Sequence, residues 1–418
     1  GGAHTYSRGF DQYSENTPQI LKRAKGVYTY DLDENKFLDY GMALRSVSLG
    51  YANEQVNNAA IKQIKLGNNL TRASHIELQA AELLIDLIDS VDMVKFTKNG
   101  STATTAAIKL SRAYTGKNLI ARCADHPFFS YDDWFVGSTP VTKGIQQKDI
   151  EGTKLFNFNN IGSLEDLFNE YPNQIACVIL EPAATEHPVN NFLQKVKELC
   201  QKNNSVFILD ETITGFRWHL KGAQYYYGVE PDLCTFGKAM ANGFSVAAVA
   251  GKREIMQQAS IEFLGTERLF MLSTTHGAEM SGLGAFVETI KFMKENNVVE
   301  HFWNYGSKLT KLINTTAKEI NLEKNFVVDG VSCSPYYLTF SKEGKNSLGL
   351  RTLFHQEMIK NGVLMPWMAI SYMHREEELR ITQKAIEETF KINRKAVDDG
   401  FEKYLVGDLI KPVFRKYN

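Results

Sequence analysis

The 418-residue sequence is short of the features that mark several large classes of protein. Its formal net charge is only −1, so it lacks the basic footprint of a protein that binds nucleic acid or an anionic membrane. No apolar run approaches the length of a membrane span, and no charged-apolar-small signal segment opens the chain. Internal repeats and low-complexity segments are also absent. We therefore expect partners that are neither nucleic acid nor membrane.

Cysteine is scarce and shows no spacing that a known chemistry would use. The five cysteines stand at positions 123, 177, 200, 234 and 333, an odd number without a CxxC pair. This pattern argues against a disulfide framework and against a metal site. We expect reduced thiols, no metal and a cytoplasmic location.

The composition that is present suits a large folded enzyme. Hydrophobic residues make up 43% of the chain and charged residues 23%, enough for a sizeable buried core. Apolar runs alternate with helical periodicity, which predicts right-handed βαβ units and a parallel sheet. We expect an N-terminal segment (1–50) that joins a small domain, a large domain (51–300) and a C-terminal small α+β domain (301–418). A hairpin at 27–40 and a long terminal helix at 384–404 complete that expectation.

The most informative stretch is 205–238, where two apolar runs end on chemically useful groups. The run 206–209 stops on the carboxylate Asp210, and the run 233–236 stops on Gly237 and Lys238. Ligands of open α/β sheets bind outside the carboxyl ends of the strands. An amine and a carboxylate in one crevice suit pyridoxal phosphate (PLP): a lysine forms the Schiff base, and an acid holds the protonated ring nitrogen. The plainer alternatives are a strand-end cap and a solvated lysine.

A second stretch predicts a phosphate site. The strand 93–97 is followed by the turn KNGST and a helix over 103–114. Free N–H groups at a helix N-terminus bind anions, and hydroxyls add donors. Gly100, Ser101 and Thr102 would then hold the phosphate, although Ser101 could equally serve as a helix cap without any ligand.

These segments together resemble a known family. The runs DETITGFR (210–217) and GAQYYYGVEPDLCTFGKAMANG (222–243) are similar to the cofactor segment of class III PLP-dependent aminotransferases, with closest likeness to the glutamate-1-semialdehyde aminomutase branch. The resemblance implies the α/β fold of PLP-dependent transferases of fold type I. In that fold a large domain carries a mainly parallel seven-stranded sheet, and both termini build a smaller α+β domain. It also implies PLP and pyridoxamine phosphate as cofactor forms, and a homodimer with shared active sites.

The resemblance assigns further residues around the cofactor ring. An aromatic residue stacks on the ring in the family, and His126 falls in that place, with Phe128 or Phe129 as alternatives. Thr212 stands where the family often has valine against the opposite face. Glu181, at the end of an apolar strand, is also expected in the cofactor site.

Other assignments concern the partner subunit and the substrate. A family threonine reaches the partner's phosphate, and Thr274 matches it best, with Thr275 as the second choice. Arg8 corresponds to an arginine that meets the substrate carboxylate; the alternative is a solvated loop arginine. The sequence departs from the branch at Thr102, where the family has an acid, and before His374, where a branch glutamate is missing.

The function expected is amino transfer between an amino donor and a keto or aldehyde acceptor by a ping-pong Schiff-base mechanism. Glutamate-1-semialdehyde 2,1-aminomutase-type transfer within one molecule is the alternative. Racemisation or decarboxylation on the same fold, and a catalytically silent binding protein, stay open as well.

Overall fold

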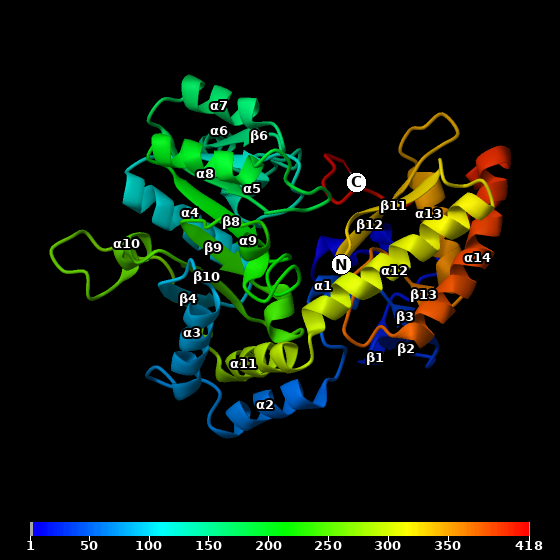
Figure 1. Cartoon of the computed structure of the whole chain (residues 1–418), viewed down its shortest axis with the longest axis horizontal. Helices are drawn as coiled ribbons and strands as arrows, with labels where there is room; N and C mark the ends of the chain where they lie inside the picture. The colour runs from blue at the N-terminus through cyan, green and yellow to red at the C-terminus, as the bar shows by residue number, and fades with distance from the viewer. Residues whose placement is uncertain (1–2, 418) are drawn as a thin grey trace. The chain divides into compact units, whose positions relative to one another are not determined.

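The computed structural model describes residues 3–417, and the chain divides into two compact units (Figure 1). Unit 2 is Glu54–Asn296 with the last residues from Lys416, and unit 1 joins the N-terminal residues up to Asn53 to Asn297–Arg415. Both ends of the chain thus contribute to unit 1, as the family resemblance implied. No helix within residues 3–417 is long and apolar enough to cross a membrane.

Unit 2 is built on a seven-stranded sheet with the order β4-β10-β9-β8-β7-β5-β6. β10 runs antiparallel to both of its neighbours, and the other strand pairs are parallel. The expected mainly parallel seven-stranded sheet is therefore confirmed. The strands are β4 (Met93–Thr97), β5 (Leu119–Cys123), β6 (Thr153–Phe156), β7 (Ile175–Leu180), β8 (Val206–Glu211), β9 (Leu233–Phe236) and β10 (Ala247–Gly251).

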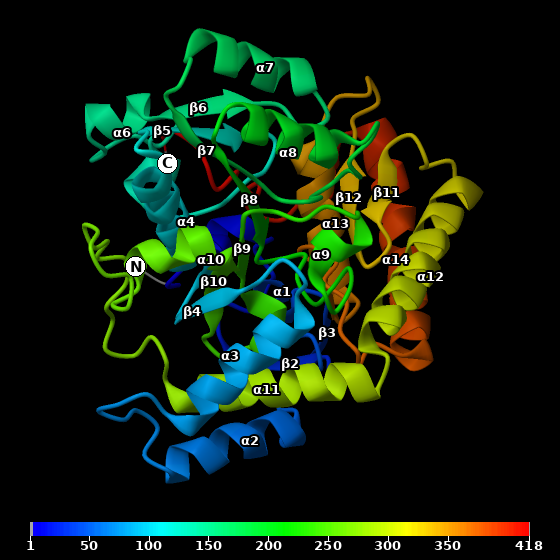
Figure 2. The ribbon, with the colours of Figure 1, turned by 60° about the vertical axis from the view of Figure 1, so that its left-hand side comes forward.

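Helices cover both faces of this sheet. On one face Val178 and Leu180 of β7 pack in a core with α7 (Ile161–Glu170) and α8 (Phe192–Lys202) (Figure 2). On the other face Cys177 lies near α4 (Gly100–Thr115). Since successive strand side chains point to opposite faces, a strand buried on both must be apolar throughout, and all six residues of β7 are buried.

Several of the remaining helices of unit 2 lie beside different strands of the sheet: α3 and α10 contact the edge strand β4, α6 contacts β6 and α9 contacts β8. α11 packs against α2 and α3, and a Cβ at Gly284 of α11 would lie 3.1 Å from the carbonyl oxygen of Ala59 on α2. The helices are α2 (Glu54–Lys65), α3 (His75–Leu87), α5 (Asp133–Val136), α6 (Gln147–Glu151), α9 (Gly222–Tyr226), α10 (Arg253–Met256) and α11 (Met280–Glu295).

Unit 1 holds a four-stranded sheet, a two-stranded sheet and long helices. The expected hairpin is confirmed by the antiparallel pair β2 and β3, and β13 adds a parallel strand from the C-terminal part. The four residues of α1 have positive φ, so α1 is a left-handed turn. The elements are β1 (Leu21–Lys25), β2 (Tyr28–Asp31), β3 (Lys36–Asp39), α1 (Met42–Arg45), α12 (Val298–Glu319), β11 (Phe326–Val331), β12 (Ser334–Thr339), α13 (Leu348–Lys360), β13 (Val363–Leu364) and α14 (Glu376–Asp399), with the short 3-10 helix η1 (Tyr6–Arg8) near the N-terminus.

The terminal helix differs from the expected range of 384–404. It begins at Glu376, where Arg375 N–H donates to Glu378 Oε2 at 2.9 Å and three glutamates occupy the first turn. Acidic side chains there are stabilised by the helix dipole. The helix ends before Gly400, whose φ of 90° breaks the helical geometry. The expectation was wrong at the start because the first turn carries charge rather than apolar periodicity.

Two fully buried histidines in unit 1 make its stability sensitive to acid. Burial, followed by repulsion from His301, lowers the pKa of His374 from 6.5 to about 3. Its ring stacks on Tyr40 with centroids 4.4 Å apart, and its Nδ1 accepts a hydrogen bond from Ser371 N–H. Burial likewise lowers the pKa of His355 to about 3.

We expect the melting temperature to fall as the pH drops below about 6.5, the pKa of an exposed histidine. Below that pH the histidines of the unfolded chain bind protons, whereas the buried histidines of the folded protein stay neutral. Their contribution to the free energy of unfolding is therefore fully present above about pH 6.5 and is lost as the pH falls toward 3. Each such histidine contributes a slope of about 1.4 kcal/mol per pH unit. Differential scanning calorimetry at pH 7 and pH 5 should show a smaller fall for His374→Phe, which keeps a ring on Tyr40. His75→Gln, at an exposed position, is the control. An equal pH dependence in wild type and His374→Phe would contradict this account.

Candidate active site

The two groups expected to define the site lie on neighbouring strands. Asp210 belongs to β8, and its register partner on the parallel strand β9 is Thr235. Lys238 follows β9 after Gly237 and begins a short 3-10 helix with a φ of 43°. Because both strands run in the same direction, the carboxylate and the amine lie toward the same edge of the sheet. The charge of Lys238 is close enough to act on the Asp210 carboxylate, and the roles of both residues toward the cofactor stay predictions.

Asp210 is a buried carboxylate held through one of its two oxygens. Oδ1 accepts hydrogen bonds from Thr212 N–H (3.0 Å) and from the Thr235 hydroxyl (2.8 Å). Burial raises the pKa of Asp210 above its usual value, while Thr212, Thr235 and the charge of Lys238 lower it again. Both regular hydrogen bonds from described residues end on Oδ1, which leaves Oδ2 to meet a cationic group.

The next residue along β8, Glu211, has a different environment. Its carboxylate accepts from Thr214 Oγ1 (2.8 Å) and from the N–H groups of Ala223 (2.6 Å) and Gln224 (2.9 Å). The Gln224 side chain adds a fourth hydrogen bond. Glu211 therefore anchors the start of α9, and Asp210 is the carboxylate of this pair that can serve a ligand.

The turn before α4 presents backbone donors as expected for a phosphate site. Asn99 is the N-cap, and its side-chain oxygen accepts from Thr102 N–H at 2.9 Å and from Thr102 Oγ1 at 3.0 Å. The carbonyl of Asn99 accepts from Ala103 N–H. Within residues 3–417 this leaves the N–H groups of Gly100 and Ser101 for an anion. The helix extends over 16 residues, so its dipole adds to the attraction.

Close backbone approach brings this turn next to the two strand ends. A Cβ at Gly100 would lie 3.0 Å from both Cγ2 and Oγ1 of Thr212, and a Cβ at Gly237 would lie 3.2 Å from that Cγ2. Thr212 itself is bonded through its N–H to Asp210. Its Oγ1 is buried and has no hydrogen-bond partner of regular geometry among residues 3–417. The phosphate turn, the aspartate and the lysine segment thus meet at Thr212.

The structure separates the aromatic candidates by exposure. His126 and Phe129 are each 2% exposed, and the His126 ring packs at 4.9 Å from Phe158. Phe128 is 48% exposed and lies edge-on to Phe135. Phe128 is therefore the most exposed of the three candidates, although it contacts Phe135 as Phe129 does.

His126 and Glu181 are neighbours at the carboxyl edge of the sheet. Nδ1 of His126 accepts a hydrogen bond from Glu181 N–H at 2.9 Å, which places the proton of the neutral ring on Nε2. Burial lowers the pKa of His126 to about 4, so the ring is neutral at neutral pH. The expected roles of both residues toward the cofactor stay predictions.

Tyr131 is an aromatic residue near the phosphate turn that the sequence did not single out. Its N–H donates to Ser101 Oγ at 3.3 Å, and its hydroxyl lies 3.4 Å from Thr102 Oγ1. The side chain is 59% exposed. Position alone could not reveal it, because it lies thirty residues from Ser101 in a loop rich in aromatic residues.

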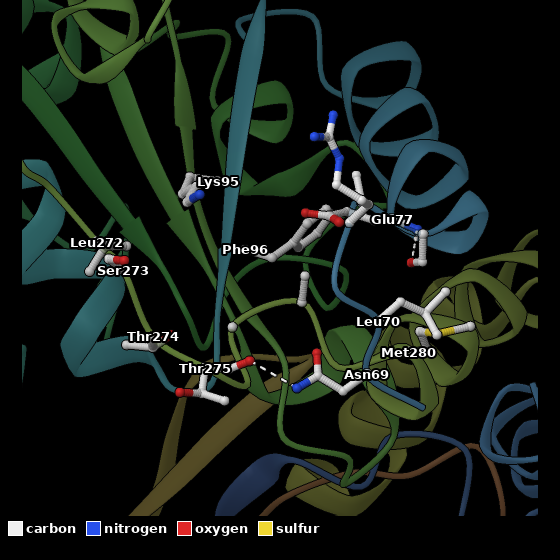
Figure 3. Close-up of a pocket in the computed structure, with 15 residues that line it drawn as sticks. Asn69, Leu70, Glu77, Lys95, Phe96, Leu272, Ser273, Thr274, Thr275 and Met280 are labelled. Carbon is white, nitrogen blue, oxygen red and sulfur yellow. Dashed lines mark hydrogen bonds between the residues drawn. The ribbon is translucent and has the colours of Figure 1, made fainter. Parts of the chain in front are cut away.

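Thr274 and Thr275 lie in an exposed loop before α11 and line a solvent-open cavity of about 270 Å³ (Figure 3). Asn69 Nδ2 donates to the Thr275 carbonyl at 3.0 Å, and Thr274 Oγ1 would lie 2.8 Å from a Cβ at Gly277. Lys95 and Ser273 complete a polar lining. The hydroxyls of this loop are accessible to a second molecule.

Arg8 ends η1 and belongs to unit 1. The side chain is exposed, and its charge lowers the pKa of Tyr13 and Tyr51, opposing the larger effect of burial on both tyrosines. Tyr51 donates a hydrogen bond to Asp39 Oδ2 at 2.7 Å. Arg8 therefore lies in a polar cluster of unit 1, and its contact with a substrate stays a prediction.

The sheet order with one antiparallel strand, the anion turn and the aspartate–lysine pair define a PLP-dependent transferase of fold type I. The donors and charges present fit PLP: backbone N–H groups for the phosphate, a carboxylate oxygen for the ring nitrogen and a lysine for the carbonyl carbon. Comparison with known proteins agrees, since the family model "Aminotransferase class-III" matches residues 10–397. The chain belongs to the class III aminotransferases, and its cofactor is PLP.

The curated relatives share nearly their whole length with this chain. A glutamate-1-semialdehyde 2,1-aminomutase of Francisella philomiragia is 30% identical over 406 residues, which is 91% of this chain and 93% of the relative. The aminomutase of the same name from Wigglesworthia glossinidia brevipalpis is 31% identical over 432 residues, with coverage of 95% and 96%.

Solved structures share the fold at lower identity. A Sphingopyxis protein in its PLP internal aldimine form has a TM-score of 0.84 at 24% identity, covering 94% of this chain and 93% of its own. An omega-transaminase from Sphaerobacter thermophilus has a TM-score of 0.82 at 23% identity, with coverage of 92% and 94%. A glutamate-1-semialdehyde aminomutase from Pseudomonas aeruginosa reaches 0.80 at 19% identity, with coverage of 91% and 89%.

Lys238→Ala should abolish turnover and leave PLP bound without a covalent link, because the amine that bonds to the cofactor is removed. Borohydride reduction followed by mass spectrometry of the intact protein checks this directly. Lys195→Ala, at an exposed position on α8, is the control and should retain the reducible bond. A cofactor mass still fixed to Lys238→Ala would show that another lysine is the anchor.

Gly100→Ala should weaken both stability and cofactor binding, since its Cβ would press on Thr212 at 3.0 Å. Overpacking of this kind costs about 1–3 kcal/mol, measurable by urea unfolding. The double variant Gly100→Ala/Thr212→Ala should recover most of the loss because the opposing atoms are gone. Gly162→Ala, whose nearest neighbour would be 3.5 Å away, is the matched control. Equal stability of Gly100→Ala and wild type would refute the close approach.

Proposed function

We propose that the protein transfers an amino group between two separate substrates, an amino donor and a keto or aldehyde acceptor, in a ping-pong reaction. The observation that carries this proposal is the stretch from about Gly137 to Thr153. The aminomutase branch that the sequence resembles has a glycine-rich lid here, and in this chain the stretch is shorter and poorer in glycine. Here this stretch includes the five-residue helix α6 (Gln147–Glu151), and at its end Thr153 Oγ1 donates to the Trp134 carbonyl at 2.7 Å. A folded segment does not supply a long closing lid, whereas a mutase must retain its intermediate.

A second observation comes from the loop before α14. Met368, Ala369 and Ile370 are at most 1% exposed, and His374 stacks in the same core. The acid of the aminomutase branch has no counterpart in this loop before His374. A transferase needs the first product to leave before the second substrate enters, and it needs no such acid near a retained amine.

Each residue has a proposed task in this reaction. PLP, when bound, supplies an electron sink for the bonds at the substrate Cα. The Lys238 amine anchors the cofactor and then moves the proton between the substrate Cα and the cofactor, for which it must be partly neutral. Asp210 Oδ2 keeps the ring nitrogen protonated. The N–H groups of Gly100 and Ser101 hold the phosphate. The N–H and hydroxyl of Thr102, the third residue expected there, both donate to Asn99 Oδ1 and so are not available to it.

Other side chains complete the ring environment. Thr212 would lie against one face of the cofactor ring, and Phe128, the most exposed of the three aromatic candidates, would cover the other. Glu181 holds His126 through its backbone N–H. None of these groups needs to titrate during the reaction.

The active protein is proposed to be a homodimer with shared sites. The exposed hydroxyls of Thr274 and Thr275 support this arrangement, since they are available to the phosphate of a second copy. The buried free thiols of all five cysteines support a reducing compartment and hence the cytoplasm.

Aminomutase activity is the second candidate, favoured by the aminomutases among the relatives of this chain. The two functions differ in a measurable way. A mutase converts an amino-aldehyde without any second substrate, whereas a transferase stops after one half-reaction and leaves the cofactor in the pyridoxamine form.

Single-turnover spectroscopy with one amino donor should show complete conversion to the pyridoxamine form, and recovery only when an acceptor is added. Arg8→Ala should raise the KM for a carboxylate-bearing donor about tenfold or more, because a charged bidentate contact is lost. An acceptor without a carboxylate should be affected less. Arg380→Ala, a substitution of an exposed arginine on α14, is the control. Sustained turnover of an amino-aldehyde alone would restore the aminomutase function.

A further inference from the structure

Thr235 stands directly beside Asp210 in the sheet, a relation that the sequence did not suggest. The two residues are register partners on the parallel strands β9 and β8, which lie side by side in Figure 1. Register partners direct their side chains to the same face. The Thr235 hydroxyl donates to Asp210 Oδ1 at 2.8 Å, and Thr235 is completely buried.

The Thr235 hydroxyl is a buried polar group in a strand whose other residues are apolar, and burying it costs free energy unless it forms a hydrogen bond. Leu233, Cys234 and Phe236 are buried with it. A valine would have nearly the same shape and no polar atom to desolvate. The only hydrogen bond of the Thr235 side chain within residues 3–417 is the one to Asp210, so the hydroxyl serves that carboxylate.

The contact determines both the orientation and the charge of Asp210. The terminal torsion of an aspartate is broad, and one hydrogen bond does not fix the plane of the carboxylate. Here Thr212 N–H and Thr235 Oγ1 both end on Oδ1, from the aspartate's own loop and from the neighbouring strand. Two donors on one oxygen leave Oδ2 in a defined position, and donors to a buried carboxylate favour its ionised form.

We propose that Thr235 is a positioning residue for the cofactor: its hydroxyl keeps Asp210 ionised and turned so that Oδ2 meets the protonated ring nitrogen. This role rests on the proposed function of Asp210. Thr235 does not touch the cofactor in this arrangement, and it acts only through the carboxylate.

Loss of the hydroxyl has consequences that can be measured on the cofactor itself. A carboxylate that is less ionised and less fixed holds the ring nitrogen's proton more weakly. PLP should then bind about tenfold more weakly, the effect expected for one hydrogen bond to a charged group. The lysine–cofactor nitrogen should also become more basic, since less positive charge resides on the ring. The pH midpoint of the absorbance change near 400 nm should therefore move upward.

The experiment compares Thr235→Val, Thr235→Ser and wild type as full-length protein. The dissociation constant of PLP is measured by adding PLP to the apoprotein, and the absorbance of the loaded protein is titrated with pH. Thr235→Val should show both changes, and Thr235→Ser, which retains the hydroxyl, should restore both values toward wild type. Thr153→Val is the matched control, because Thr153 is a buried strand threonine of the same sheet whose hydroxyl donates to a backbone carbonyl.

Asp210→Asn, measured in parallel, distinguishes an error in the role proposed for Asp210 from an error in the role proposed for Thr235. If Asp210→Asn leaves PLP affinity and the midpoint unchanged, the proposed role of Asp210 itself is wrong. If Asp210→Asn alters both but Thr235→Val does not, only the role of Thr235 is overturned. The role of Thr235 is also overturned if Thr153→Val changes the PLP affinity and the pH midpoint as much as Thr235→Val does. It is overturned as well if Thr235→Val lowers the melting temperature and changes neither of these quantities. In the Asp210→Asn background, Thr235→Val should add no further effect, because the two act as one unit.

Discussion

The cost of burying the Asp210 carboxylate is the constraint on which the site depends. β8 is buried along all six residues, so a charge at its end is largely desolvated. Donors from Thr212 and Thr235 and the nearby charge of Lys238 offset that cost. The adjacent Glu211 is also buried, and there the desolvation is offset by hydrogen bonds from the N–H groups of Ala223 and Gln224 at the start of α9. The hydrogen bonds to Glu211 thus use both of its carboxylate oxygens, whereas those to Asp210 end on Oδ1.

The second constraint is the space around Thr212. Gly100 and Gly237 approach this side chain so closely that an added Cβ would meet it at 3.0 and 3.2 Å. The absence of these Cβ atoms lets the phosphate turn of α4 and the lysine segment after β9 meet next to Asp210. A cofactor with a phosphate at one end and a ring nitrogen at the other requires donors and a carboxylate at a fixed separation. The glycines therefore matter for geometry rather than for chain flexibility.

The chain shares its family and nearly its whole length with aminomutases. The proposal that it is a transferase rests on two segments. The stretch after Phe135 contains α6, and the loop before α14 is buried in the core of unit 1. Amino transfer needs PLP, an anchoring lysine and an acid at the ring nitrogen, which transferases and mutases have in common. The choice between them lies in peripheral segments, because these decide whether the intermediate can leave.

The sequence by itself determined where the strands lie and which polar residues stand at or just after their ends, such as Asp210 and Lys238. The prediction of a strand at 233–236 matches the structure because a strand buried on both faces is a mainly apolar run with abrupt polar ends. The strand predicted at 93–97 also forms, at the edge of the sheet and with Lys95 exposed. The start of α14 was missed because its first turn is stabilised by capping and charge, not by burial. Only the tertiary structure separated the exposed Phe128 from the buried His126, and only it brought Thr235 against Asp210. Local patterns encode which residues are buried, whereas the identity of a side chain's neighbour depends on strand order and register, which arise from long-range packing.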